Sequence, residues 1–211
     1  MLDRSKLKVA EDYFLGGNHE LSTHAYQDLI LEHSNNPKIL VNKSIAEFKD
    51  GHYGSSLVDL YRAKKIIPRD GKLNTNIELV QEELNLNQPN LSFLNYLTVN
   101  EILVVLLIAN LFYVLRWRLS KSKIMRFFIS SVFVLVLIFA TYTYVNQEMI
   151  DYAVVQASSS KVYSGNSDSF SEIGELLEGQ VVKVKAKQEA WSQISYNKQL
   201  GWVKEENLAY F

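Results

Sequence analysis

Two stretches of almost uninterrupted apolar residues constrain the fold of this 211-residue chain more than any other feature. They cover residues 96–115 and 127–145, and each approaches the about 20 helical residues that cross a hydrocarbon core of about 30 Å. Each is apolar around the whole helix, which is not typical of a helix in a small soluble domain. We therefore expect two transmembrane helices joined by a short hairpin connection, and a buried soluble hairpin is the alternative.

The connection between the two spans, residues 116–126, carries five Lys and Arg residues and no acidic residue. Such a loop stays on the cytoplasmic side, so both termini are expected in the periplasm and the chain in the inner membrane. The first span contains Asn110, for which we expect a helix–helix contact, and Glu101 is expected at the membrane interface. Two helices do not easily enclose a pathway, so a transport function is disfavoured.

The residue types exclude several functions. The chain has no cysteine, which rules out disulfides, thiolate metal sites and a cysteine nucleophile. Outside the hairpin connection the 23 acidic residues outnumber the 17 basic ones, so no basic surface for nucleic acid is expected. No triad, carboxylate pair, phosphate-binding loop or metal motif has the required spacing, and the four histidines are not spaced as ligands. We expect no catalytic residues, no metal and no cofactor, and hence no enzyme.

Residues before the first span repeat at an offset of 34. Phe14 corresponds to Phe48, Gly17 to Gly51, and Ser22 to Ser56. Over about residues 4–84 the chain resembles the tetratricopeptide family, whose repeat has this length, and the repeat domain is expected at 1–87. The resemblance implies an all-α solenoid of two repeats and a capping helix, with both glycines in left-handed turns. Small residues are expected where the helices approach closely: Ala10, Ser22, Ser44, Ser56 and Ala63.

The tetratricopeptide resemblance also implies an inner groove that binds peptides or proteins. By register with the repeat, the residues that face this groove are Leu7, Glu11, Phe14, Val41, Ile45, Phe48 and Lys72. The alternative is that the apolar members of this set belong to the core.

From residue 152 to residue 211 the pattern changes to short alternating strands separated by turns, which predicts a small all-β antiparallel barrel. Strands are expected at 153–157, 161–163, 180–186, 191–196 and 200–203. The acidic stretch 169–178 is expected to be a solvated loop.

The barrel segment resembles the bacterial SH3-type domain. The resemblance rests on Val162-Tyr-Ser-Gly165, Leu177-Glu-Gly179, Trp191 and Gly201-Trp-Val203. It implies an SH3-like barrel in which Tyr163, Trp191 and Trp202 contact a partner, and the two tryptophans are either core residues or a platform for a ligand. Enzymes often use this domain to bind cell-wall peptide.

The order of the modules is uncommon: tetratricopeptide repeats, a linker at 88–95, a hairpin of two spans and an SH3-type barrel. It resembles the BatE proteins of bacterial aerotolerance operons. This resemblance implies a non-enzymatic membrane scaffold whose partners are von Willebrand factor A-domain membrane proteins and a MoxR-type ATPase. A peptidoglycan-binding sensor is the alternative. Periplasmic modules require export, so we expect a signal peptide upstream of Met1 in the natural chain, and a repeat domain that stays in the cytoplasm is the alternative.

Overall fold

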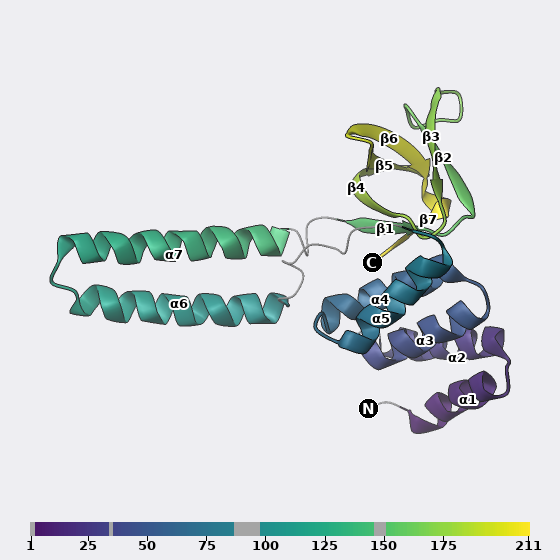
Figure 1. The fold of residues 1–211 in the computed structure, drawn as a ribbon, viewed down its shortest axis with the longest axis horizontal. Helices are drawn as coiled ribbons and strands as arrows, with labels where there is room; N and C mark the ends of the chain where they lie inside the picture. The colour runs from purple at the N-terminus through teal and green to yellow at the C-terminus, as the bar shows by residue number, and fades with distance from the viewer. Residues whose placement is uncertain (1–2, 34–35, 87–97, 146–150) are drawn as a thin grey trace. The chain divides into compact units, whose positions relative to one another are not determined.

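The computed structural model describes residues 3–33, 36–86, 98–145 and 151–211 (Figure 1). The chain forms two compact units, Met1–Asn90 together with Asp151–Phe211, and Leu91–Ile150. The linker expected at 88–95 lies outside the described residues.

Five helices make up the first part of the larger unit and run antiparallel to their neighbours in the chain (Figure 1). Their bounds are α1 Arg4–Leu15, α2 His19–Glu32, α3 Pro37–Lys49, α4 Tyr53–Ile66 and α5 Gly71–Glu83. Side-chain caps begin three of them: Asp3 accepts from the Ser5 amide, Asn36 from that of Lys38, and Asp70 from that of Leu73. Such caps satisfy amides that have no partner within the helix.

The contacts within the helix pair α1–α2 recur in the pair α3–α4 at the same offset of 34 residues. The Ser22 hydroxyl donates to the Ala10 carbonyl at 2.9 Å, and the Ser56 hydroxyl donates to the Ser44 carbonyl at 2.9 Å. All four residues are buried, which confirms the expected close approach of the helices.

The turns between the paired helices repeat as well. Gly17 has a φ of 77° and Gly51 a φ of 84°, as the sequence predicts for left-handed turns. Across each turn two aromatic rings meet, Phe14 with His19 at 5.1 Å and Phe48 with Tyr53 at 5.4 Å between centroids. The repetition in the sequence is therefore a repetition in geometry.

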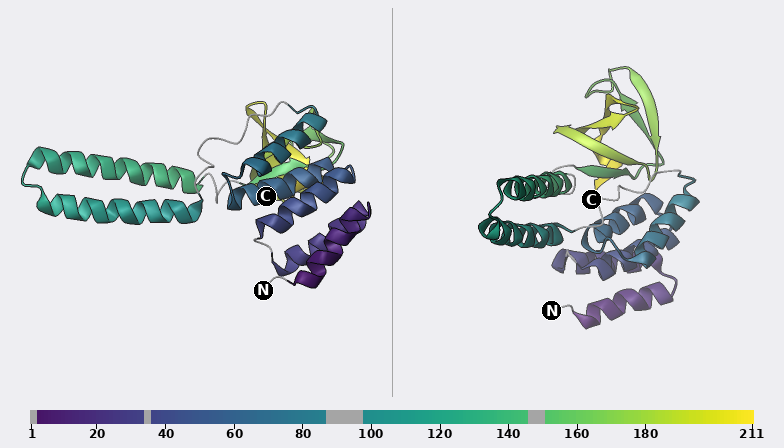
Figure 2. Two further views of the ribbon diagram at one scale, coloured as in Figure 1. Left: turned by 60° about the horizontal axis from the view of Figure 1, so that its bottom comes forward. Right: turned by 60° about the vertical axis from the view of Figure 1, so that its left-hand side comes forward.

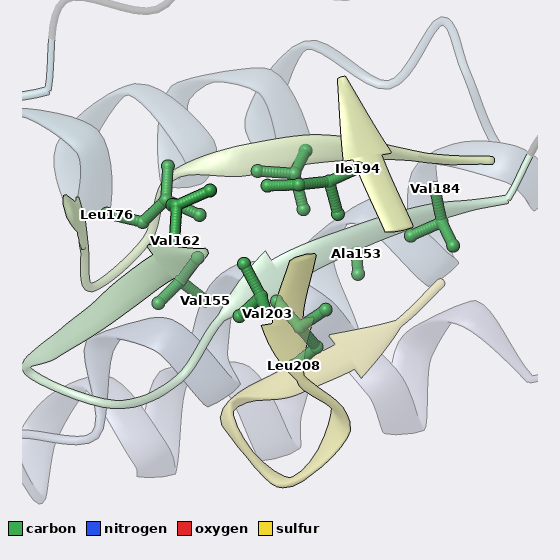
Figure 3. Close-up of a cluster of buried hydrophobic side chains, with 9 residues drawn as sticks. Ala153, Val155, Val162, Leu176, Val184, Ile194, Val203 and Leu208 are labelled. Carbon is green, nitrogen blue, oxygen red and sulfur yellow. The ribbon is translucent and has the colours of Figure 1, made fainter. Parts of the chain in front are cut away.

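Seven short strands follow from Tyr152 and form an antiparallel sheet in the order β3-β2-β6-β5-β4-β1-β7. Their bounds are β1 Tyr152–Val155, β2 Ser159–Tyr163, β3 Glu172–Leu177, β4 Val181–Gln188, β5 Trp191–Tyr196, β6 Gln199–Lys204 and β7 Leu208–Tyr210. The sheet curls around buried aliphatic side chains, among them Val155, Val162, Ile194 and Val203 (Figure 3). This is the small all-β module that the alternating pattern predicts.

The prediction of a solvated loop at 169–178 is wrong for most of that segment, because Glu172–Leu177 is strand β3. Its acidic residues are exposed, while Leu176 is only 5% exposed and belongs to the core. Lys161 of β2 pairs with Glu172 at 2.7 Å, so these charges face the neighbouring strand. Acidic side chains on the exposed face of an edge strand resemble a loop in composition, and the irregular pairing of β3 with β2 leaves the segment without strict alternation. Strand β7 was also missed.

The five helices and the barrel are in contact within their unit. The Gly54 amide, in the first turn of α4, donates to the Glu178 carboxylate at 2.7 Å. Arg62 bonds the Tyr210 carbonyl at 2.8 Å, and the ring of Tyr61 stacks on that of Phe211 at 4.7 Å. Strands β1 and β7 of the barrel therefore pack on α4.

The smaller unit is a hairpin of α6 Val99–Leu119 and α7 Lys123–Tyr144, which lie side by side (Figures 1 and 2). Both are long and apolar enough to cross a membrane by length and composition. Tyr113 of α6 stacks on Phe133 of α7, with 4.6 Å between ring centroids.

At the connection both hairpin helices extend beyond the apolar stretches of the sequence. Helix α6 includes Arg116 and Arg118, and α7 begins at Lys123, so only Ser120–Ser122 connect the helices. Long cationic side chains can extend toward water from a helical backbone, so the helices need not end where the charges begin. Glu101 forms a capping box with Thr98.

The Asn110 side chain is exposed on α6, so the helix–helix contact expected for it is not made within this hairpin. The side of α6 that faces α7 carries Tyr113 and Ala109 instead.

Candidate binding surfaces

An open groove on the helical part is formed by the first three helices. It has a volume of about 270 Å³ and is lined by Glu11, Phe14, Leu15, Tyr26, Asn42 and Ile45. Three of these, Glu11, Phe14 and Ile45, are among the groove residues predicted from the repeat. Leu15, Tyr26 and Asn42 were not predicted, because Tyr26 comes from the second helix of the repeat and Leu15 from the end of the first.

The floor and rim of the groove differ in polarity. Tyr26 is 3% exposed, and burial together with the negative charge of Glu11 raises the pKa of its hydroxyl, which Asn42 hydrogen-bonds. Leu15 is 82% exposed and Phe14 is half-buried. The groove therefore offers apolar surface beside one carboxylate, with a fixed hydroxyl and amide at its base. It suits an apolar side chain followed by a cationic or hydrogen-bonding group.

The other predicted groove residues do not line this space. Leu7 packs against the buried cluster of Ala10, Tyr26, Leu29 and Ile39. Val41 and Phe48 are half-buried, and Lys72 is exposed in the first turn of α5. The structure thus gathers part of the predicted set, and Leu7 takes the core position that the alternative describes.

The barrel presents an aromatic surface built from β2, β5 and β6. The ring of Tyr163 meets that of Trp191 edge to face, with 5.5 Å between centroids. Trp191 is directly opposite Lys204 in the strand register, and Trp202 is opposite both Gln193 and Tyr163. Residues directly opposite in neighbouring strands point to the same face of a sheet. Their strand neighbours Val203 and Ile194 point to the other face, into the core.

Trp191 is only 9% exposed, although it lies outside the aliphatic core cluster. Its ring contacts that of Tyr163, and the Lys204 ammonium lies 5.8 Å from its ring centroid. Asp168, in the loop after β2, holds that ammonium at 3.0 Å, which raises the pKa of Lys204. Trp191 thus supports this surface from beneath, and Tyr163 and Trp202 are half-buried parts of it.

Residues 158–209 match the family model of the bacterial SH3 domain. The match covers every strand except β1 and the end of β7, and it includes all three aromatic residues of the surface. No match was found among curated proteins. Within the described ranges, no group of three or more His, Asp or Glu residues is placed to hold a metal ion.

Proposed function

We propose that this protein is a membrane-anchored, non-enzymatic adaptor that binds protein partners through its helical groove and its SH3 domain. The observation that carries the proposal is the presence in one chain of a bacterial SH3 domain, a module that binds proteins or peptidoglycan, a groove among repeated helix pairs, and two apolar helices.

The helical part is proposed to be a pair of tetratricopeptide repeats with α5 as the cap. Its support is the recurrence, at 34 residues, of the turn glycine, the Ser-to-carbonyl bond and the aromatic contact across the turn. Solenoid ends need a polar cap, and α5 is exposed along one side. Groove-lining residues from α1 and α3 agree with the way such repeats bind peptides.

The same order of modules supports a place among BatE-like proteins of aerotolerance operons. In that case the partners are von Willebrand factor A-domain membrane proteins and a MoxR-type ATPase, and both modules are periplasmic. The cations around Ser120–Ser122 support this orientation.

The test is co-purification from native membranes with two variants of the full chain. Phe14→Ala removes apolar surface from the groove, and Tyr163→Ala removes it from the SH3 surface. Loss of partners with Phe14→Ala, and their retention with the exposed and distant Leu79→Ala, is the expected result. Unchanged partners with both groove and SH3 variants would contradict the adaptor function.

Peptidoglycan binding is the second candidate, favoured by the aromatic SH3 surface. Isolated cell-wall sacculi would retain the full chain, and Tyr163→Ala would release it, if the SH3 domain binds the wall. The adaptor function predicts no retention by sacculi.

A further inference from the structure

Helix α6 carries a second, unpartnered side that the hairpin leaves uncovered. The residues Leu103, Leu107, Asn110, Val114 and Trp117 follow one another at spacings of four and three. The four apolar members are 58%, 69%, 51% and 40% exposed, and Asn110 is exposed as well. Residues at alternating spacings of four and three lie along one side of a helix, and we call this side of α6 the seam. The other sides of α6 are apolar as well, and the polar Asn110 distinguishes this side from them.

Asn110 lies at the middle of the candidate span Asn100–Leu119, so its amide would be near the centre of the bilayer. Hydrocarbon offers no hydrogen-bond partner to a side-chain amide, and leaving one unpaired is unfavourable. Helix α7 does not supply the partner, because its contact with α6 runs through Tyr113 and Phe133. Intramembrane polar residues characteristically bond across helix–helix interfaces.

We propose that α6 associates with α6 of a second copy of this chain, with the two Asn110 amides bonded to each other. The proposal rests on the membrane placement in the proposed function and adds the oligomeric state to it. An asparagine side chain has both a donor and an acceptor, so two copies related by a twofold axis satisfy one another reciprocally. A parallel pair of identical seams also places Leu107 and Val114 beside their own counterparts, as in a dimer with one polar layer.

Two faces of the same helix provide a matched control. Val104 and Leu111 are 57% and 58% exposed, similar to Leu103 and Val114, but they lie outside the seam. The chain has no cysteine, so single cysteines can be placed at each position without background. Disulfide formation in liposomes containing the full chain then maps the side of α6 that meets the second copy.

The expected result is efficient crosslinking through Leu107→Cys and Val114→Cys and little through Val104→Cys and Leu111→Cys. Equal crosslinking at all four positions, or none, would overturn the proposal. Association of the two copies can be measured by subunit capture or energy transfer as the protein is diluted in lipid. Asn110→Leu is expected to weaken this association about 3- to 30-fold, the range of one interhelical hydrogen bond. Asn110→Gln, which keeps the donor and acceptor, is expected to restore most of it.

Carbonate extraction of the membranes separates this proposal from the one on which it rests. A chain released by carbonate would refute the membrane placement and the dimer together. A chain that stays integral but monomeric would refute only the dimer. If Asn110→Leu leaves the purified chain unchanged and removes another membrane protein from the native complex, the seam binds that partner, and the twofold pair is wrong.

Discussion

Glu47 should make the stability of the helical part depend on pH. Its carboxylate is 4% exposed and accepts a hydrogen bond at 2.6 Å from Lys43, whose ammonium also bonds Asp59 at 2.7 Å. Burial, opposed by Lys43 and assisted by the like charge of Asp59, raises the pKa of Glu47 from 4.5 to about 7. Burial opposes the charge of Lys43, but the two carboxylates raise the pKa of Lys43, so it stays protonated in this range.

The sign of the effect follows from the proton bound by the folded state. Because the folded-state pKa is above the unfolded value, the stabilising contribution of Glu47 is complete below pH 4.5 and is lost as the pH rises through 7. The difference is about 2.5 pH units, each equivalent to about 1.36 kcal/mol, which gives roughly 3 kcal/mol between pH 4 and pH 8.

The assay is amide hydrogen exchange of α3 and α4 in the detergent-solubilised full chain, corrected for the intrinsic effect of pH on exchange. Glu47→Gln mimics the protonated acid and is expected to remove the fall in opening free energy above pH 5. Glu82→Gln changes an exposed carboxyl of α5 and should leave that fall in place. An equal fall in Glu47→Gln and the native chain would refute the assignment.

Two packing predictions follow from buried positions of each module. Ala63 is completely buried in α4, so the larger side chain of Ala63→Phe is expected to lower the free energy of unfolding by about 1–3 kcal/mol. The denaturant midpoint of the helices should fall. An unchanged midpoint would mean that the helical register is wrong. Trp191→Ala removes the support of the SH3 surface and is expected to cost about 3–5 kcal/mol in the barrel, measured by denaturation of the full chain. Near-native barrel stability with lost partner binding would instead make Trp191 a ligand platform.

The sequence predicted those parts of the fold in which one local signal decides the structure. The 34-residue offset located both left-handed glycines, Gly17 and Gly51, because a positive φ favours glycine. It also located the small buried serines, because a larger side chain would not fit between the closely packed helices. The alternation of Trp191–Tyr196 predicted β5 at the bounds that the structure has. At Glu172–Leu177 strict alternation is absent, and the acidic composition was misleading.

The binding surfaces were predicted less completely because they depend on tertiary packing. Of the residues assigned from repeat register, Glu11, Phe14 and Ile45 line one groove, but the register could not show that Tyr26 reaches the same groove from α2. The sequence did not decide whether Trp191 is a core residue or part of a platform for a ligand. Strand register places the side chain on the outer face, where its ring contacts Tyr163 and the Lys204 ammonium. The side of α6 that faces α7 was likewise set by packing of the two helices.

The orientation in the membrane is a further prediction, and the structure locates the cations on which it rests. The five cations of Arg116–Arg126 are now concentrated in the last turns of α6, the first turns of α7 and the three residues between them. Moving each against the membrane potential costs about 2.3 kcal/mol per 100 mV, in addition to the loss of its hydration. Since no comparable cluster flanks the other ends of the helices, the connection should stay in the cytoplasm.

Single cysteines test this orientation on the cysteine-free chain. Ser122, in the connection, is exposed, as are Thr75 of α5 and Ser169 of the SH3 domain. Ser55 is a poorer choice, because it is half-buried and hydrogen-bonded to Gln156. In intact spheroplasts a membrane-impermeant maleimide should label Thr75→Cys and Ser169→Cys and should reach Ser122→Cys only after lysis.

The contacts between the helices and the barrel restrict the possible labelling patterns further than the number of membrane spans does. Residues before the hairpin, Gly54 and Arg62, bond residues after it, Glu178 and Tyr210, so both modules must lie on one side of any membrane. Thr75→Cys and Ser169→Cys should therefore always label together. Labelling of only one would mean that a single helix crosses and that the interface does not form in the membrane-bound chain. Labelling of Ser122→Cys alone would place both modules in the cytoplasm and make the protein a cytoplasmic adaptor.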